Sequence, residues 1–451
     1  MKIIITGAGS VGSAICRELV AEGHAITVLD RSESAITELS NRYDVTGVIG
    51  GCTDLDALRE AGAERADLLI AITASDEINL LCCFAAKKLG VKHTAARVRN
   101  PEYSSFAELT SADMGLGLII NPELYAARTI SRVLRLPSAT RVDTFCEGRV
   151  ETIELTVSED SPMAGKSLYN LREELGVSFL ICGIKREDEV FIPNGATEFM
   201  PRDTVCVTTA VDDTVKFLKA IKSYKRPVKN LMILGGGRTT YYLCDLLRRT
   251  KTDITVIEKD PEVCRGLSLD HGVTVINGDG MRQDLLIEEG IERADAFISL
   301  SDVDEENAIS SMFAANMKVP VVITMISSLP YVSFFQRAGL DNIVSPKHST
   351  VGQILKFVRG MADSRGSEIR AIHHMMAGAL ESLEFNVTEP IAGVTDIPIK
   401  DINRRDDMLI ACIVRGKDII IPSGHDSILV GDSVIVVAKG TALNSIKDIL
   451  K

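Results

Sequence analysis

A glycine-rich segment near the N-terminus has the residue types and spacing of a phosphate-binding loop. Gly7, Gly9 and Gly12 follow the apolar run 3–6 and precede a helical pattern of apolar residues. In such loops the first glycine permits a tight turn, the second lets a phosphate approach the backbone, and the third lets the helix pack against the strand. The helix N-terminus then offers unpaired N–H groups to an anion. The residues expected to contact a nucleotide here are Gly7, Ala8, Gly9, Ser10, Val11 and Gly12.

Asp30 occupies the position at which a fold of this kind places its ribose contact. It ends the apolar run 26–29, about 20 residues beyond the glycine segment, as the dinucleotide-binding pattern requires. A carboxylate accepts hydrogen bonds from a ribose diol and repels a 2′-phosphate, so NAD or ATP is favoured over NADP. The adjacent Arg31 weakens that exclusion, and we include it among the expected contacts.

Further candidate contact residues follow three more predicted strands. Ligands lie at the carboxyl ends of the strands in an open parallel sheet, so these residues are expected to face the nucleotide. They are Gly51, Cys52 and Thr53, then Thr73, Ala74, Asp76 and Asn79, and finally Arg97 and Arg99. Asp76 begins a helical pattern, where capping is an equally good interpretation. The arginines alternate onto one face of the predicted strand 93–98 and suit a polyphosphate, and a surface ion-pair face is the alternative.

The second half of the chain repeats the first. The shift in numbering that carries Gly7 onto Gly235 also carries Asp30 onto Glu258 and Asn79 onto Asn307, and we call it the repeat shift. A repeat of this length indicates duplicated domains rather than a solenoid. The residues expected to form the second site are Gly235, Gly236, Gly237, Arg238, Thr239, Glu258, Gly278, Asp279 and Ser301.

The second site departs from the first at positions that matter for phosphate binding. Thr240 stands where the third glycine belongs, and the two arginines map to Met325 and Ser327. We therefore expect the second site to bind less tightly or to bind a different nucleotide, and an empty structural copy is the remaining alternative.

A smaller duplicated unit follows each large one. Ile192-Pro-Asn-Gly195 resembles Ile421-Pro-Ser-Gly424, and the surrounding stretches alternate apolar and polar residues between turn signals, which is typical of short strands. The fold class expected is α/β, with two tandem Rossmann-like, doubly wound parallel-sheet domains, each followed by a small α+β domain. The expected boundaries are 1–138, 139–226, 227–365 and 366–451.

Composition excludes several classes of partner. The chain of 451 residues has 62 acidic and 50 basic residues, a net charge of −12, which argues against binding to nucleic acid or to an anionic lipid surface. Its apolar runs are strand-sized, so we expect no direct insertion into a membrane. The ten cysteines form no Cys-x-x-Cys pair and the histidines have no metal-ligand spacing, so we expect reduced thiols and no metal site.

These features together resemble a known family. The glycine segment, Thr73-Ala-Ser-Asp-Glu-Ile-Asn79, Ala95-Ala-Arg-Val-Arg-Asn-Pro-Glu-Tyr103 and the doubled small unit carry a resemblance that covers the whole chain. The chain resembles the TrkA family, the peripheral subunits of Trk potassium-uptake systems, built from two tandem RCK (KTN) units. The resemblance implies a soluble, cytoplasmic homo-oligomer, a tetrameric ring, held at the inner face of the membrane by a potassium channel or transporter subunit of the TrkH/TrkG type. NAD(H) or ATP/ADP would bias the ring and gate the pore.

Two other functions compete with this interpretation. An NAD-dependent dehydrogenase would need a general acid or base near the nicotinamide, yet 139–228 contains no His and no Tyr is followed by Lys four residues later. The chain is therefore expected not to be an enzyme and to have no catalytic residues. A nucleotide or redox sensor serving another transporter is the second alternative.

Overall fold

Both halves of the chain contribute to each of two structural units. The computed structural model describes residues 1–187, 189–340, 342–361, 367–440, 443 and 445–451. One unit contains Met1–Arg128 and Leu231–Leu355, and the other contains Thr129–Asn230 and Lys356–Lys451. The boundary expected between residues 365 and 366 lies outside the described residues. Among the described helices, none has the length and apolarity needed to cross a bilayer.

The first half of the first unit is an open parallel sheet. Its strands are β1 (Lys2–Thr6), β2 (Ala25–Asp30), β3 (Val45–Ile49), β4 (Leu68–Ala71), β5 (His93–Arg97) and β6 (Leu118–Ile120). Its helices are α1 (Ser10–Ala21), α2 (Glu33–Arg42), α3 (Leu55–Glu60), α4 (Asp76–Leu89), α5 (Pro101–Met114) and α6 (Pro122–Arg135). The order β3-β2-β1-β4-β5-β6 reverses between β1 and β4, and the crevice beyond these two strands is where such sheets bind ligands.

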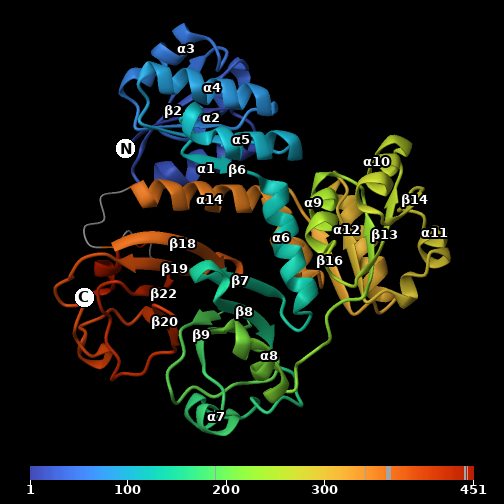
Figure 1. Ribbon diagram of the computed structural model, residues 1–451, viewed down its shortest axis with the longest axis vertical. Coiled ribbons are helices and arrows are strands. Elements are labelled where there is room, and N and C mark those ends of the chain that lie inside the picture. Colours follow the sequence, from blue (N-terminus) through green and yellow to red (C-terminus); the bar gives the residue numbers. More distant parts are fainter. Residues whose placement is uncertain (188, 341, 362–366, 441–442, 444) are drawn as a thin grey trace. The chain divides into compact units, whose positions relative to one another are not determined.

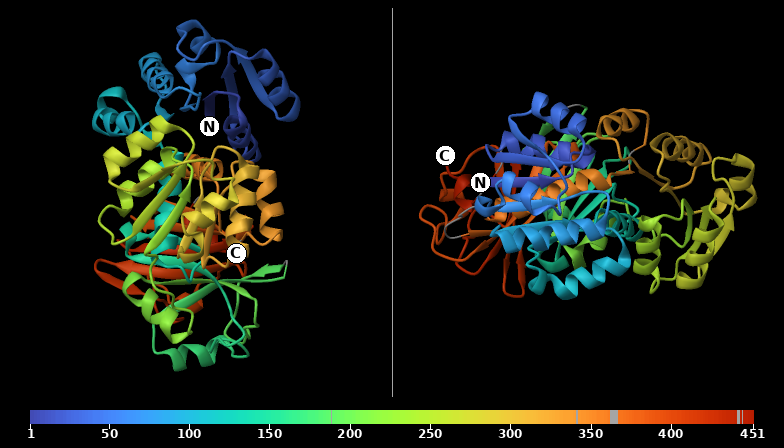
Figure 2. Two further views of the ribbon diagram at one scale, coloured as in Figure 1. Left: turned by 90° about the vertical axis from the view of Figure 1, so that its right-hand side faces the viewer. Right: turned by 90° about the horizontal axis from the view of Figure 1, so that it is seen from above.

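The second half of this unit repeats that sheet. Its strands are β12 (Asn230–Leu234), β13 (Asp253–Glu258), β14 (Thr274–Asn277), β15 (Ala296–Ser299), β16 (Val321–Met325) and β17 (Asn342–Val344). Its helices are α9 (Arg238–Leu247), α10 (Pro261–His271), α11 (Gln283–Glu288), α12 (Asp304–Asn316), α13 (Leu329–Arg337) and α14 (Pro346–Met361). The strand order is the same, β14-β13-β12-β15-β16-β17, and helices lie on both faces of the sheet (Figure 2, left).

The second unit consists of two antiparallel sheets with equivalent strand orders. The first, β10-β9-β11-β8-β7, is formed by β7 (Arg141–Phe145), β8 (Val150–Thr156), β9 (Phe179–Arg186), β10 (Glu189–Phe191) and β11 (Thr204–Ala210), with α7 (Leu168–Leu175) and α8 (Val211–Ala220). The second, β18-β19-β22-β20-β21, is formed by β18 (Ser367–Met375), β19 (Leu380–Val387), β20 (Met408–Arg415), β21 (Asp418–Ile420) and β22 (Ser433–Lys439). These four sheets confirm the predicted fold class.

The two antiparallel sheets share one hydrophobic core and are tied by reciprocal hydrogen bonds. They lie side by side in Figure 1, and buried residues of both, such as Cys182 and Val437, belong to one cluster. The backbone N–H of Cys146 donates to Glu384 Oε2 at 2.8 Å, and the N–H of Met376 donates to Glu154 Oε1 at 2.8 Å. The two donors occupy equivalent positions of the doubled small unit, as do the two acceptors, so the sheets pair with pseudo-twofold symmetry.

Candidate nucleotide-binding sites

The glycines of the first loop have three separate roles. Gly7 has φ +108°, a conformation that L side chains rarely adopt, and it turns the chain from β1 into α1. A Cβ at Gly12 would lie 2.0 Å from the carbonyl oxygen of Gly7, so only glycine lets α1 lie this close to the loop. A Cβ at Gly9 would have no atom within 4 Å. The chain itself therefore leaves the space beside Gly9 open, where the sequence predicts the pyrophosphate.

The N-terminus of α1 faces that open space without a capping side chain. Gly9 is the N-cap residue, and no side chain bonds the first turn of the helix. The N–H groups of Ser10, Val11 and Gly12 have no helical partner, because the first turn of any α-helix lacks acceptors. Ser10 is exposed, whereas Val11 packs into the core. This arrangement favours an anion at the helix end.

Asp30 holds the loop in place as well as facing the predicted ribose position. Its Oδ2 accepts a hydrogen bond from the N–H of Ala8 at 2.7 Å, and its Oδ1 accepts one from the N–H of Ser32 at 2.8 Å. Glu258 of the second half accepts a hydrogen bond from the N–H of Gly236 at 2.6 Å in the same way. Each carboxylate oxygen has a second lone pair beyond the one that accepts from the backbone.

Arg31 lies over Gly51 at the end of β3. A Cβ at Gly51 would be 3.3 Å from the guanidinium of Arg31, so the absence of a side chain at position 51 makes room for this cation. Cys52 follows in a buried position, and Thr53 is exposed. The pKa of Cys52 is lowered to about 7, chiefly by a hydrogen bond from the Cys82 thiol, with a smaller contribution from the charge of Arg31.

The side chain of Asn79 links the ends of β4 and β5 through hydrogen bonds to their backbones. Its side-chain oxygen accepts a hydrogen bond from the N–H of Thr73 at 2.8 Å, and its amide nitrogen donates to the carbonyl of Arg97 at 2.9 Å. The guanidinium of Arg97 donates to the carbonyl of Thr73 at 2.7 Å, and its Nε is buried without a partner among the described groups. Ala74 is exposed beside them. Thr73 and Arg97 are thereby positioned at the strand ends.

Arg99 lies beyond β5, which ends at Arg97, so the expectation that both arginines alternate on one strand is wrong. Burial lowers the pKa of Arg97, and the charge of Arg99 lowers it further. Asp76 accepts a hydrogen bond from the backbone N–H of Arg99 at 2.8 Å. The Nε of Arg99 donates to Glu123 Oε1 at 2.6 Å. Asp76 therefore positions the turn after β5, and Glu123, which the sequence did not point to, neutralises Arg99.

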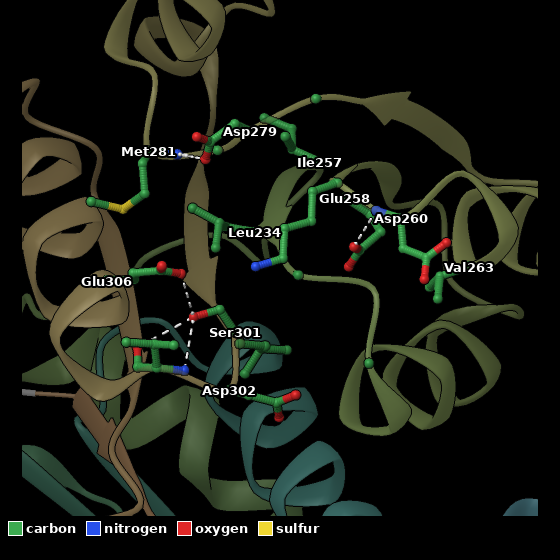
Figure 3. Close-up of a pocket in the computed structure, with 17 residues that line it drawn as sticks. Leu234, Ile257, Glu258, Asp260, Val263, Asp279, Met281, Ser301, Asp302 and Glu306 are labelled. Atoms are coloured by element: carbon green, nitrogen blue, oxygen red, sulfur yellow. Dashed lines mark hydrogen bonds between the residues drawn. The ribbon is translucent and has the colours of Figure 1, made fainter.

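The second site is a cavity of about 400 Å³ at the carboxyl ends of β12, β13 and β15 (Figure 3). Of the residues predicted for this site, those that line the cavity are Gly235, Gly237, Glu258, Gly278, Asp279 and Ser301, whereas Gly236, Arg238 and Thr239 are not among its lining residues. The sequence missed the charged lining residues Lys259, Asp260, Asp302 and Glu306. Five carboxylates and one ammonium group line the cavity, a balance that disfavours a triphosphate.

Thr240 compensates for the missing third glycine of the second loop. Its hydroxyl donates a hydrogen bond to the carbonyl of Gly235 at 2.5 Å, where the first loop has the bare contact between Gly12 and Gly7. Gly235 keeps φ +95°, and Gly237 is again an N-cap without a side-chain hydrogen bond. The second loop thus retains the turn and the open helix end of the first.

Two glycine turns, each between the first strand and first helix of a doubly wound parallel sheet, place the chain in the class of tandem Rossmann-type proteins. The TrkA-N domain matches residues 3–122 and 231–346, and the TrkA-C domain matches residues 152–222 and 383–451. The chain belongs to the TrkA family.

Relatives of known name and solved structures agree with this assignment. The Trk system potassium uptake protein TrkA homolog of Archaeoglobus fulgidus is 32% identical over all of both chains. The Trk system potassium uptake protein TrkA of Halomonas elongata is 33% identical over 97% of this chain and 95% of its own length. The crystal structure of the GsuK RCK domain has a TM-score of 0.63 at 19% identity and covers 97% of this chain and 92% of that chain, so it supports the fold.

Proposed function

We propose that this chain is a cytoplasmic, nucleotide-sensing regulatory subunit of a Trk-type potassium-uptake system and has no enzymatic activity of its own. The observation that carries the proposal is the first loop, which has an uncapped helix end and open space beside Gly9. The chain that contains this loop is 32% identical to a Trk system protein. The polar residues nearest this loop, such as Asp30, Asn79 and Asp76, bond to the backbone, which suits binding better than proton transfer.

The ligands proposed are NAD(H) and ATP or ADP. Asp30 suits a ribose diol, and the guanidinium groups of Arg31, Arg97 and Arg99 suit phosphate groups. A solved GsuK channel structure, similar in fold at a TM-score of 0.63, contains NAD. The acidic second cavity is proposed to hold a ligand of lower negative charge, so a dinucleotide fits it better than ATP.

Assembly through copies of the same chain is proposed from an apolar patch that occurs on both halves. In the first half this patch consists of Leu81, Phe84 and Phe106 on α4 and α5, and in the second half of Ile309, Met312 and Phe334 on α12 and α13. The repeat shift relates each position of one patch to a position of the other, and the six side chains are 39–57% exposed. Two equivalent patches per chain allow head-to-tail association that closes into a ring, for which we propose four copies.

The partner proposed is a separate membrane subunit of the TrkH/TrkG type. Such a subunit is reconstituted in proteoliposomes with and without this chain, and K⁺ flux is measured at increasing ATP, ADP and NADH. A nucleotide-dependent change in flux of about fivefold or more is expected, because allosteric ligands typically change an equilibrium by that much. Nucleotide binding without any effect on flux would instead support a sensor for another transporter.

The same preparation tests the assembly. Native mass spectrometry should give a tetramer, and Phe106→Glu should reduce it, because a carboxylate in an apolar contact is costly to bury. A wild-type chain that stays monomeric at flux-assay concentrations contradicts the proposed ring.

A further inference from the structure

A buried hydrogen-bonded bridge joins the helix of the second glycine loop to the arginine segment of the first site. Tyr242 lies in α9, which starts directly after Gly237. Its hydroxyl donates to the backbone carbonyl of Arg99 at 3.0 Å and accepts from the side-chain amide of Asn121 at 2.7 Å. All of these residues belong to the same structural unit. The two predicted sites are therefore connected by a single side chain.

The polar groups of the bridge are hydrogen-bonded. Tyr242 is 8% exposed, and burial raises its pKa to about 12, so the phenol keeps its proton and can donate throughout the physiological range. The side-chain oxygen of Asn121 accepts from the N–H of Leu124 at 2.9 Å, which caps the start of α6. Loss of the Tyr242 hydroxyl would leave a buried amide N–H and a carbonyl without this partner.

The residues that meet at the bridge are those that set the position of Arg99. Its backbone N–H is held by Asp76, its carbonyl by Tyr242, and its guanidinium by Glu123, which lies in the first turn of α6. A movement of α9 would therefore shift both the carbonyl of Arg99 and the Asn121 cap at the start of α6.

The tyrosine of the bridge has no counterpart at the equivalent position of the first half. Under the repeat shift, the residue of the first half equivalent to Tyr242 is Ala14, which has no side-chain polar atom. The residue equivalent to Arg99 is Ser327, whose N–H is held by Asp304 as that of Arg99 is held by Asp76. The tyrosine is thus an addition to one half of an otherwise duplicated arrangement.

We propose that Tyr242 couples the two nucleotide sites, an inference that rests on the proposed nucleotide binding. A ligand on the second loop orders the first turn of α9, and Tyr242, at the start of the next turn, then holds Arg99 and the Asn121 cap in the arrangement the first site needs. The first ligand to bind pays the entropy cost of ordering the bridge. The second ligand then binds to a bridge that is already ordered, so its affinity is higher and binding is cooperative. The coupling must be reciprocal, because each ligand changes the affinity of the other by the same factor.

The test uses calorimetric titrations of the full chain with ATP and with NADH. Asp30→Ala and Glu258→Ala first assign each nucleotide to a site. The ligand of the first site is then titrated with and without saturation of the second site. If one nucleotide fills both sites, its single-site constants come from Glu258→Ala and Asp30→Ala, and the product of the two wild-type stepwise constants divided by the product of these single-site constants gives the coupling factor. We expect a factor of about five or more for the wild type and less than about twofold for Tyr242→Phe, which keeps the ring and loses the hydroxyl.

Tyr241→Phe is the matched control. It removes the neighbouring hydroxyl, from a ring that packs on His271 with centroids 4.4 Å apart, and should keep the wild-type coupling factor. A second measurement follows amide hydrogen exchange at Leu124 and Tyr125, whose N–H groups are bonded to the side chain and the backbone carbonyl of Asn121. Filling the second site should slow this exchange in the wild type and leave it unchanged in Tyr242→Phe.

Each remaining outcome overturns a defined claim. A Tyr242→Phe chain that retains the wild-type coupling factor, or a wild type whose two sites bind independently, refutes the bridge while leaving the proposed function intact. Failure of the wild type to bind either ATP or NADH overturns the proposed nucleotide function and the coupling with it.

Discussion

Replacing Gly9 by Ala should separate nucleotide binding from folding. Gly9 has φ −69° and ψ −173°, a conformation that alanine adopts readily, and its Cβ would have no atom within 4 Å. The free energy of unfolding should therefore change by less than about 0.5 kcal/mol. The new methyl group would occupy the space where the pyrophosphate meets the N–H groups of α1. Losing one charge-assisted hydrogen bond costs about 1.5–3 kcal/mol, so we expect affinity to fall about 10- to 150-fold.

Calorimetric titration and thermal unfolding of the same samples check both parts of this prediction. Gly237→Ala is the matched control, since Gly237 has φ −67° and ψ −174° and also has open space around its Cβ, so it should weaken the second site and leave the affinity of the first site unchanged when the second is empty. Gly12→Ala is the opposite case, because its Cβ would lie 2.0 Å from a backbone oxygen and must move α1. A Gly9→Ala chain with wild-type affinity and wild-type stability would refute the placement of the phosphates.

Two further predictions concern charge. Arg97→Met with Arg99→Ser, which gives the first half the residues of the second, should lower ATP affinity about 10- to 100-fold and NADH affinity much less, as measured by titration. Burial raises the pKa of Glu154 above its usual value, so the stability this group contributes is present at low pH and is lost as pH rises through that raised pKa. Glu154→Gln, which keeps the oxygen that accepts from Met376, should therefore gain stability relative to the wild type as pH rises through the raised pKa, as measured by urea unfolding between pH 5 and pH 8. A constant difference across this pH range would contradict the burial of a carboxylate there.

Local sequence patterns predicted the parts of this structure that local physics determines. The spacing of Gly7, Gly9 and Gly12 led to the loop because the backbone itself requires glycine at the first and third of these positions. The repeat shift led to two identical strand orders because a duplicated chain keeps the alternation of its strands and helices.

The partners of the site residues could not be predicted in this way. Glu123 is 24 residues from Arg99 and Tyr242 is 143 residues away, and no periodicity relates them. Asp76 was expected either to cap its helix or to contact the ligand. Ser75 caps the helix, and Asp76 accepts from the N–H groups of Arg99 and Asn100, a pairing that the sequence did not indicate. Such contacts form between residues that are far apart in the sequence, and they depend on which strands and helices the fold places side by side. Local sequence patterns do not contain this information.

The two kinds of domain preserve the duplication to different degrees, and this follows from what each must bury. In the antiparallel pair, Glu154 and Glu384 each accept from a backbone N–H of the other half of the unit, so a change in either sheet leaves a carboxylate of its neighbour without that partner. The ligand edges of the parallel sheets carry no such mutual constraint, since each loop is held by its own acid. The first edge therefore carries two arginines that the second lacks, and the second carries four carboxylates at positions where the first has none. Mutual hydrogen bonds thus keep the antiparallel pair symmetric, whereas separately held loops leave the two parallel sheets free to diverge.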